Sequence, residues 1–207
     1  AVMNVDFEKK AYEFLHIDSL DEGTDFYAPQ TLEDGNGRRI MLAWLDMWNN
    51  NSFSKNNRLV SNGVYTLPRD LVLENGRLLQ YPIREVKDIF RNRFTVAEGG
   101  EMSKTAYIEA EMNGGSLFTF GCGDDYISLK IENGRFTLEQ RQKNHITAVR
   151  KGKYRSDTFH VEIFTDRCSL EVFVDNRDVF SAQVFIECER YKIMRSEKIK
   201  ILRAASV

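Results

Sequence analysis

Acidic and aromatic side chains are concentrated in one short segment of the chain, residues 21–48. The side chains in question are Asp21, Asp25, Tyr27, Trp44 and Trp48. Carboxylates accept hydrogen bonds from sugar hydroxyls, and the C–H face of a sugar ring stacks on an aromatic ring. The segment is therefore a candidate sugar-binding site, and a buried turn is the alternative that the residues alone leave open.

Cysteine and histidine spacing offers little for other chemistry. The cysteines, Cys122, Cys168 and Cys188, are odd in number and widely spaced, which favours neither a disulfide framework nor a zinc ribbon. The histidines, His16, His145 and His160, have no partner at metal-ligand spacing in the sequence. We expect no metal and no organic cofactor.

The second half of the chain is dominated by alternation of apolar and polar residues. Runs of this kind cover residues 127–132, 136–139, 159–164 and 170–175. Turn sequences separate them: Asn113-Gly114-Gly115, Asn133-Gly134 and Asp175-Asn176. Short alternating runs with Asn-Gly turns predict hairpins, so residues 101–207 are expected to form an antiparallel β-sandwich of roughly eight strands.

The first part is also β-rich, but it is built differently. A continuous apolar run covers residues 39–44, and residues 71–79 predict a hairpin around Asn75-Gly76. The asparagine-rich residues 49–57 read as a surface loop. Apolar residues at helical spacing in 82–94 predict a short helix linking the two β regions.

Composition excludes two classes of protein. The 207 residues include 29 Lys and Arg against 31 Asp and Glu, which gives a formal net charge of −2. This balance does not fit a strongly basic nucleic-acid binder. No apolar run approaches the ~20 residues of a membrane-spanning helix.

Three motifs make the sequence resemble glycoside hydrolase family 32, which includes invertases, sucrose-6-phosphate hydrolases, levanases and inulinases. DEGTDFYAPQTLEDGNGRRIMLAWLDMW, residues 21–48, resembles the family's last-blade motif. NGVYTLPRDLVLENGRLLQYPIREV, residues 62–86, resembles the segment that follows, with Asp70 in place of the usual Glu. DRCSLEVFVDN, residues 166–176, resembles a motif of the family's C-terminal sandwich. The three motifs occur in the family's order.

The resemblance implies an all-β fold: the final blade of a five-bladed β-propeller followed by an antiparallel β-sandwich. Residues 1–85 would be the remnant of the last propeller blade, 86–100 a linker and 101–207 the sandwich. The start, Ala1-Val2-Met3 followed by VDFEKKAYEF, looks like the end of a preceding blade. We therefore expect a C-terminal part of a longer enzyme.

The activity implied by the resemblance is retaining hydrolysis of β-fructofuranosides, which needs a nucleophilic carboxylate and a carboxylic acid. The family carries its nucleophile in Asn-Asp-Pro and a fructose-binding aspartate in Arg-Asp-Pro, and neither tripeptide occurs here. Glu187-Cys188 matches the family's acid/base pair in letters, but it lies about 160 positions after the Asp-Phe-Tyr-Ala segment that it should precede. It is expected to be a solvent-facing Glu on a sandwich strand. We expect no catalytic residue in this chain, which alone should be inactive.

Some substrate-contacting residues are expected to remain. By motif, Tyr27 and Trp48 match positions that line the family's fructose pocket, and Trp44 is expected in the blade core. Asp25 beside Tyr27 could orient the strand end or a sugar hydroxyl, or make only a turn or inter-blade hydrogen bond. Asn62 stands where many members carry tryptophan.

Two other classes of function remain as alternatives: a freestanding carbohydrate-binding, lectin-like sandwich, and an assembly module. A lectin should expose aromatic residues on the sandwich, where only Phe173 and Tyr126 are candidates. A lone blade would leave Ile40, Leu42, Trp44 and Val64 partly exposed, so we expect self-association through the blade edge. Residues 45–48 resemble intracellular bacterial family members, which predicts a cytoplasmic location. The expected partner is a β-fructofuranoside, with no nucleic acid or membrane.

Overall fold

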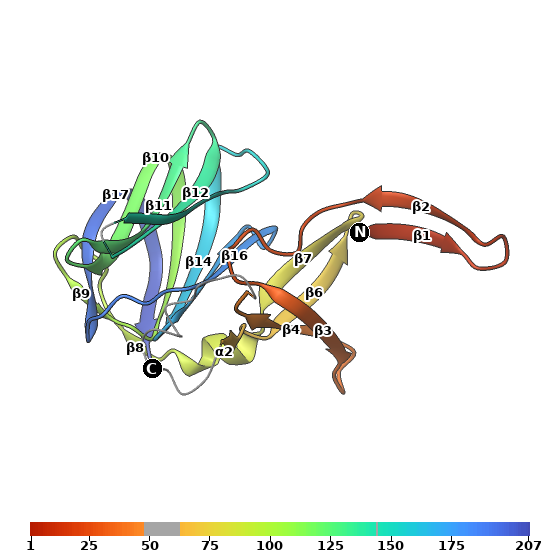
Figure 1. Ribbon diagram of the computed structural model, residues 1–207, viewed down its shortest axis with the longest axis horizontal. Helices are drawn as coiled ribbons and strands as arrows, with labels where there is room; N and C mark the ends of the chain where they lie inside the picture. Colours follow the sequence, from red (N-terminus) through yellow and green to blue (C-terminus); the bar gives the residue numbers. More distant parts are fainter. Residues whose placement is uncertain (48–62, 144) are drawn as a thin grey trace.

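The computed structural model describes residues 1–47, 63–143 and 145–207, and within these the side chains of 201–203 are not described. Trp48, Asn62 and the surface loop predicted at 49–57 lie outside the described residues. The chain is nearly all β, as predicted (Figure 1). Among the described residues, no helix is long and apolar enough to cross a membrane.

The first sheet is a two-stranded hairpin, β1 (Val2–Asp6) with β2 (Ala11–His16). It extends away from the rest of the molecule, and a second sheet lies between it and the sandwich (Figure 1). The second sheet runs in the order β3-β4-β6-β7, with β5 added beside β4. Its strands are β3 (Tyr27–Glu33), β4 (Arg39–Leu45), β5 (Val64–Tyr65), β6 (Arg69–Glu74) and β7 (Arg77–Pro82). We call this sheet the blade.

The predicted blade turns are present. Asn75 and Gly76 adopt positive φ values of 50° and 72° between β6 and β7, as a two-residue hairpin requires. Leu42 and Trp44 on β4 and Val64 on β5 are half-buried, as expected, whereas Ile40 is buried. Ile40 is covered because the neighbouring strands β3 and β6 both pair with it.

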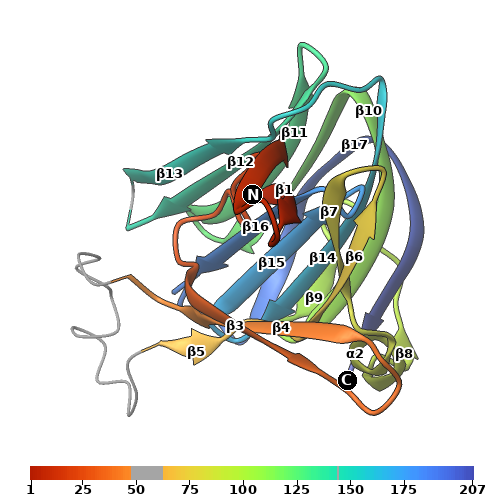
Figure 2. The ribbon, with the colours of Figure 1, turned by 90° about the vertical axis from the view of Figure 1, so that its right-hand side faces the viewer.

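The third sheet has ten strands and forms the sandwich. Its main path is β13 (His145–Lys151), β12 (Arg135–Gln142), β11 (Asp125–Glu132), β10 (Ala106–Cys122), β14 (Thr158–Asp166), β15 (Ser169–Val174) and β16 (Asp178–Gln183). Strand β17 (Arg190–Ser206) lies along β10 and also pairs with β8 (Asn92–Arg93) and β9 (Glu101–Ser103). Figure 2 shows β16, β15, β14 and β10 side by side.

The long strand β10 changes partner along its length. Residues 117–122 pair with β11, and residues 106–113 pair with β14. Because one strand serves both halves, the sheet folds over a single core that includes Phe118, Phe136, Phe159 and Phe180.

One predicted turn is wrong. Asn113-Gly114-Gly115 does not end a strand but lies inside β10. Gly115 has φ +83°, and the register with β17 shifts between Met112 and Leu117, so the glycines form an irregularity in a continuing strand. Asn133-Gly134 and Asp175-Asn176 do form the predicted hairpin turns, with φ between 49° and 69°.

A short helix, α2 (Arg84–Ile89), connects the blade to the sandwich within the predicted 82–94 segment. Val86 packs with Ile83 and Phe90 against an outer cluster on the sandwich made by Tyr107, Phe164 and Phe173. Ile89, another apolar residue of the 82–94 segment, is 53% exposed. The outer cluster is also why β14 and β15 are buried on both faces.

Candidate functional site: an aromatic row and the blade–sandwich junction

Three aromatic residues form a row across one face of the blade. Tyr27 on β3 lies opposite Trp44 on β4, and Trp44 lies opposite Tyr65 on β5. The Tyr27 and Trp44 rings are 6.0 Å apart between centroids at 74°, an edge-to-face contact. Tyr27 is 40% and Tyr65 77% exposed. The row offers C–H-accepting aromatic surface of the kind that sugars stack on.

The sequence analysis missed Tyr65, which joins the row only through strand pairing. It also missed Asp46, a buried carboxylate just beyond β4 that accepts a 2.7 Å hydrogen bond from the backbone N of Met47. Gly63 packs against Trp44 and Asp46: an added Cβ would lie 2.2 Å from Trp44 Nε1 and 3.0 Å from Asp46 Cβ. Its φ of +74° also favours glycine. The entry to β5 is therefore fixed by close packing on Trp44.

Asp25 is buried, and its carboxylate faces the sandwich. Its Oδ2 accepts hydrogen bonds from Thr24 Oγ1 at 2.5 Å and from the backbone N of Gln183, at the end of β16, at 2.9 Å. The residue thus fixes the chain two positions before Tyr27, at the start of β3. Of the predicted binding residues, Asp25 and Tyr27 are close in the chain, and Trp48 lies outside the described residues.

The segment before β3 is bound to β16 through the backbone. The N–H groups of Thr24 and Asp25 donate to the Ser181 carbonyl at 3.0 and 3.2 Å, and that of Glu22 donates to Val179 at 2.7 Å. Asp21 Oδ1 accepts from the backbone N of Ser181 at 2.9 Å. The first residues of the blade motif therefore act as a clamp on the sandwich.

A buried arginine lies at the centre of this junction. Arg69 is fully buried and forms ion pairs with Asp21 at 3.0 Å and Glu171 at 2.7 Å. It also donates to Gln80 Oε1 at 3.0 Å and to Ser181 Oγ at 2.5 Å. A buried charge is tolerated only when it is paired and hydrogen-bonded in this way.

Two carboxylates share this one guanidinium, and one of them, that of Glu171, is buried. Burial raises the pKa of Glu171 above its usual range, Arg69 opposes the rise, and the nearby charge of Asp21 adds to it. We did not expect this network, because Asp21, Arg69 and Glu171 belong to three motifs that are far apart in sequence.

Glu187 is exposed, as expected, but it lies in the segment between β16 and β17 and not on a strand. Cys188 beside it is half-buried against the sandwich core, and burial raises the pKa of its thiol to about 11, with Cys122 adding to the rise. Glu187 therefore belongs to the sandwich, while the aromatic row belongs to the blade.

Comparison with known proteins gives matches in both halves. The model of the glycosyl hydrolases family 32 N-terminal domain matches residues 1–82, and that of the family 32 C terminal matches residues 122–204. Among curated proteins, sucrose-6-phosphate hydrolase of Bacillus subtilis is 29% identical over 198 residues, which are 89% of this chain and 41% of the relative. The chain thus spans less than half the length of that relative.

Solved structures share the fold. The structure of sucrose-6-phosphate hydrolase from Lactobacillus gasseri matches with a TM-score of 0.80 at 17% identity. The match covers 99% of this chain and 46% of the Lactobacillus gasseri chain. A Bombyx mori GH32 β-fructofuranosidase mutant in complex with sucrose has a TM-score of 0.72 at 21% identity over 97% of this chain and 45% of its own. With both family models matched in order, and with the blade and sandwich present as the motifs implied, the chain belongs to glycosyl hydrolase family 32.

Proposed function

We propose that this chain is the C-terminal part of a β-fructofuranosidase that hydrolyses sucrose, sucrose-6-phosphate or fructans with retention. The observation that carries the proposal is the ordered match of the two family models to residues 1–82 and 122–204. The buried junction around Arg69 adds support, because it fixes a blade rigidly to a sandwich. The names of the bacterial relatives favour sucrose-6-phosphate among the substrates.

In this proposal the chain contributes substrate contacts and no reacting carboxylate. Retaining hydrolysis requires a nucleophile and an acid/base about 5–5.5 Å apart, and the 207 residues contain neither the Asn-Asp-Pro nor the Arg-Asp-Pro tripeptide. Tyr27 and Trp48 would line the fructose pocket. Asp25 would act as a positioning residue, since its carboxylate ties the start of β3 to the backbone N of Gln183.

The test is hydrolysis of sucrose and of sucrose-6-phosphate by the 207-residue chain, with released reducing sugar as the readout. We expect no turnover above the buffer blank, because the sequence lacks the motifs in which the family carries its nucleophile and its fructose-binding aspartate. Turnover that is abolished by Glu187→Gln or Asp25→Asn would contradict the assignment. A matched Glu74→Gln variant, changed at an exposed position on the blade, controls for unspecific effects.

A lectin-like sandwich is the alternative function, and the sandwich offers it little support. Phe173 is buried in the outer cluster, and Tyr126 is half-buried with its hydroxyl donating to Glu139 at 2.8 Å. The exposed aromatic row lies on the blade instead. The resemblance of residues 45–48 to intracellular bacterial enzymes supports, as a proposal, a cytoplasmic location.

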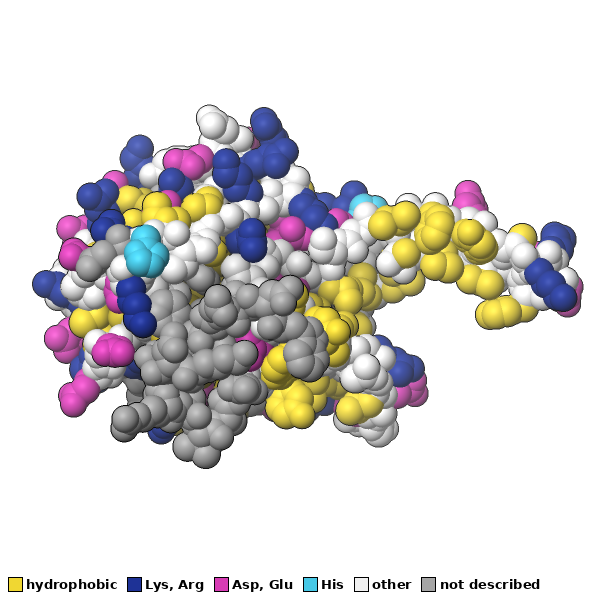
Figure 3. All heavy atoms as spheres, in the orientation of Figure 1, with side chains coloured by type: hydrophobic (Ala, Val, Ile, Leu, Met, Phe, Trp, Pro, Cys, Tyr) yellow, Lys and Arg dark blue, Asp and Glu magenta, His cyan; other side chains and the backbone are white. Residues whose placement is uncertain are grey.

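We also propose that the isolated chain self-associates through the blade. Leu32 on β3 is 52% exposed and Leu73 on β6 is 62% exposed, and β3 is an edge strand, which favours pairing with another chain. Further hydrophobic side chains cover the projecting hairpin (Figure 3).

Light scattering after size exclusion should give a mass above that of the monomer when the chain is present at tens of micromolar. Leu32→Lys should shift it toward monomer, and Ile146→Lys, at the sandwich edge strand β13, should not. A clean wild-type monomer would contradict this.

A further inference from the structure

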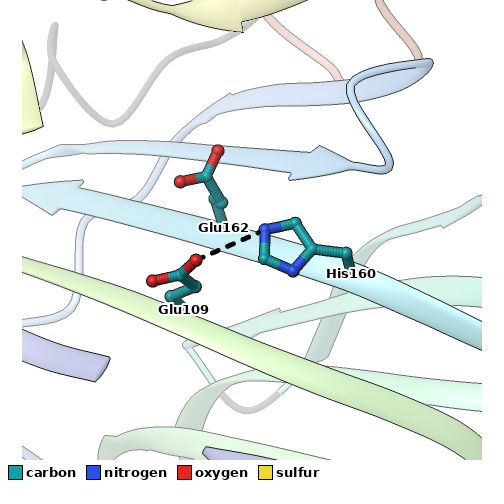
Figure 4. Close-up of side chains that lie close together, drawn as sticks. All are labelled: Glu109, His160 and Glu162. Carbon is teal, nitrogen blue, oxygen red and sulfur yellow. Dashed lines mark ion pairs between the residues drawn. The ribbon is translucent and has the colours of Figure 1, made fainter. Parts of the chain in front are cut away.

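A cluster of ionisable side chains lies on the outer face of the sandwich, away from the aromatic row. Glu109 is on β10, and His160 and Glu162 are on the adjacent β14 (Figure 4). Glu109 lies directly opposite Glu162, and Glu111 lies opposite His160. The four side chains therefore form two neighbouring cross-strand pairs on rigid, hydrogen-bonded strands.

The imidazole of His160 is held between carboxylates. Its Nδ1 is 3.1 Å from Glu111 Oε1, and its Nε2 is 3.6 Å from Glu109 Oε1. Each of Glu109, His160 and Glu162 offers one potential metal-ligand atom, and these three atoms all lie within 4.8 Å of one another. A proton on Nδ1 shared with Glu111 leaves the Nε2 lone pair directed toward Glu109. A carboxylate that holds the far nitrogen of a ligating histidine is the usual outer partner in metal sites.

Carboxylates meet across the two strands at this position. Like charges directly opposite on neighbouring strands are destabilising, and Glu109 and Glu162 form such a pair. The Glu162 side chain is only 2% exposed; its Oε1 accepts from the Tyr107 hydroxyl at 2.6 Å and pairs with Lys87 Nζ at 2.5 Å. Lys87 reaches in from α2, is 37% exposed and supplies a single charge on a flexible side chain.

We propose that Glu109, His160 and Glu162 bind a divalent transition-metal ion of the Zn²⁺ type. One imidazole with two carboxylates is a ligand set suited to such ions, which take His nitrogen at ~2.0–2.1 Å and carboxylate oxygen at ~2.0–2.2 Å. Small side-chain rotations bring three atoms already this close onto one ion. Glu111 is a positioning residue that orients the imidazole, and Lys87 is a competitor that must leave Glu162 when the ion binds.

His160 has no partner at metal-ligand spacing along the sequence, and its carboxylate neighbours come from an adjacent strand. Glu109 is 51 positions before His160, and only the β10–β14 register brings them together. Lys87 of α2 contacts Glu162, so the ion would bind where the linking helix meets the sandwich. Its role is structural, and it does not depend on the proposed hydrolase function.

The test is calorimetric titration of the chelator-treated 207-residue chain with Zn²⁺. We expect one equivalent to bind, and His160→Gln and Glu109→Gln to abolish that binding. Glu111→Gln should weaken it about 10- to 100-fold, as loss of an outer partner does. His145→Gln, at an exposed histidine on β13, is the matched control and should bind as wild type. Wild-type binding in His160→Gln, or no binding in wild type, overturns the proposal.

Two further variants test which side chains hold the ion. Lys87→Met should bind Zn²⁺ more tightly than wild type, because Glu162 loses its competing ammonium, and Zn²⁺ should raise its melting temperature more. A Cys122→Ser/Cys188→Ser double variant should bind as wild type. If the double variant loses binding, or if Co²⁺ gives a thiolate charge-transfer band, the ion is held by cysteine and the proposal is wrong.

Discussion

Arg69→Met is expected to lower the unfolding free energy by about 3–5 kcal/mol, because breaking a buried ion pair from one side leaves the partner charge buried and uncompensated. Here two carboxylates, Asp21 and Glu171, would lose the same cation. Urea unfolding at pH 8 measures the loss. Arg39→Met, which removes an exposed arginine paired with Glu33, is the matched control and should change stability by less than about 1 kcal/mol.

The Arg69→Met defect should shrink as pH falls. Glu171 already has a pKa raised by burial, and loss of Arg69 removes an interaction that opposes the rise. Because the pKa of Glu171 is higher in the folded state than its ordinary value of 4.5, protonated Glu171 stabilises the folded state below pH 4.5. This contribution to stability is lost as pH rises through the folded-state pKa. Arg69→Met should therefore lie closer to wild type at pH 4.5 than at pH 8.

Adding Glu171→Gln to Arg69→Met should recover part of the loss at pH 8, because a neutral amide is cheaper to bury than a carboxylate. The same double variant should lose most of the pH dependence. The loss of unfolding free energy in Arg69→Met could instead be equal at both pH values and unchanged by Glu171→Gln. That result would show that Arg69 acts through packing on Phe26 and Phe173, whose ring centroids lie 4.9 and 5.4 Å from its guanidinium carbon.

In Arg69→Met, the sandwich should stay folded and resist proteolysis when the blade does not. Within the part of the chain that the structure describes, the main core of the sandwich, around Phe118, Phe136 and Phe180, includes no buried residue of the blade. The outer cluster depends on Val86 of α2 and on the sandwich residue Phe173. Limited proteolysis of Arg69→Met should therefore remove the N-terminal part and leave a resistant product that contains residues 101–207.

Local signals in the sequence predicted the strands and most turns. Asn75-Gly76 and Asn133-Gly134 turn the chain as expected, because a positive φ at both positions is a property of the dipeptide itself. The same logic failed at Asn113-Gly114-Gly115, where pairing with β17 resumes beyond the glycines, at Leu117, and keeps the strand continuous. Whether glycine makes a turn or an irregular strand is decided by neighbours that local sequence does not show.

Interactions between distant segments were not predicted. Each of the three family motifs contributes one residue to the junction: Asp21, Arg69 and Glu171. In the sequence the three motifs identify the family, and in the structure one residue of each joins a single network. Tyr65 and His160 were missed for the same reason, since strand register places the partners of both. Asp25 was expected to orient the strand end or a sugar hydroxyl, or to make only a structural hydrogen bond. Its carboxylate accepts a hydrogen bond from the backbone N of Gln183 in the sandwich, a contact that its position in the sequence did not reveal.

Gly23→Ala is expected to cost about 1–3 kcal/mol through overpacking at the clamp. A Cβ at this position would lie 2.0 Å from the carbonyl oxygen and 2.3 Å from the nitrogen of Ser181, and backbone of β16 cannot rotate away as a side chain could. The hydrogen bonds from Thr24 and Asp25 to the same carbonyl would lengthen together. Gly35→Ala is the matched control, because a Cβ there meets nothing within 4 Å.

Combining Gly23→Ala with Arg69→Met distinguishes one junction from two independent contacts. Ser181 serves both: its carbonyl accepts from Thr24, and its hydroxyl accepts from Arg69 at 2.5 Å. Once Gly23→Ala has loosened the blade from β16, Arg69→Met has fewer contacts left to disrupt. The double variant should therefore lose less unfolding free energy than the sum of the losses in the two single variants. Sites without shared partners add within about 0.3–0.5 kcal/mol. Additive losses would mean that the clamp and the ion network stabilise the molecule separately.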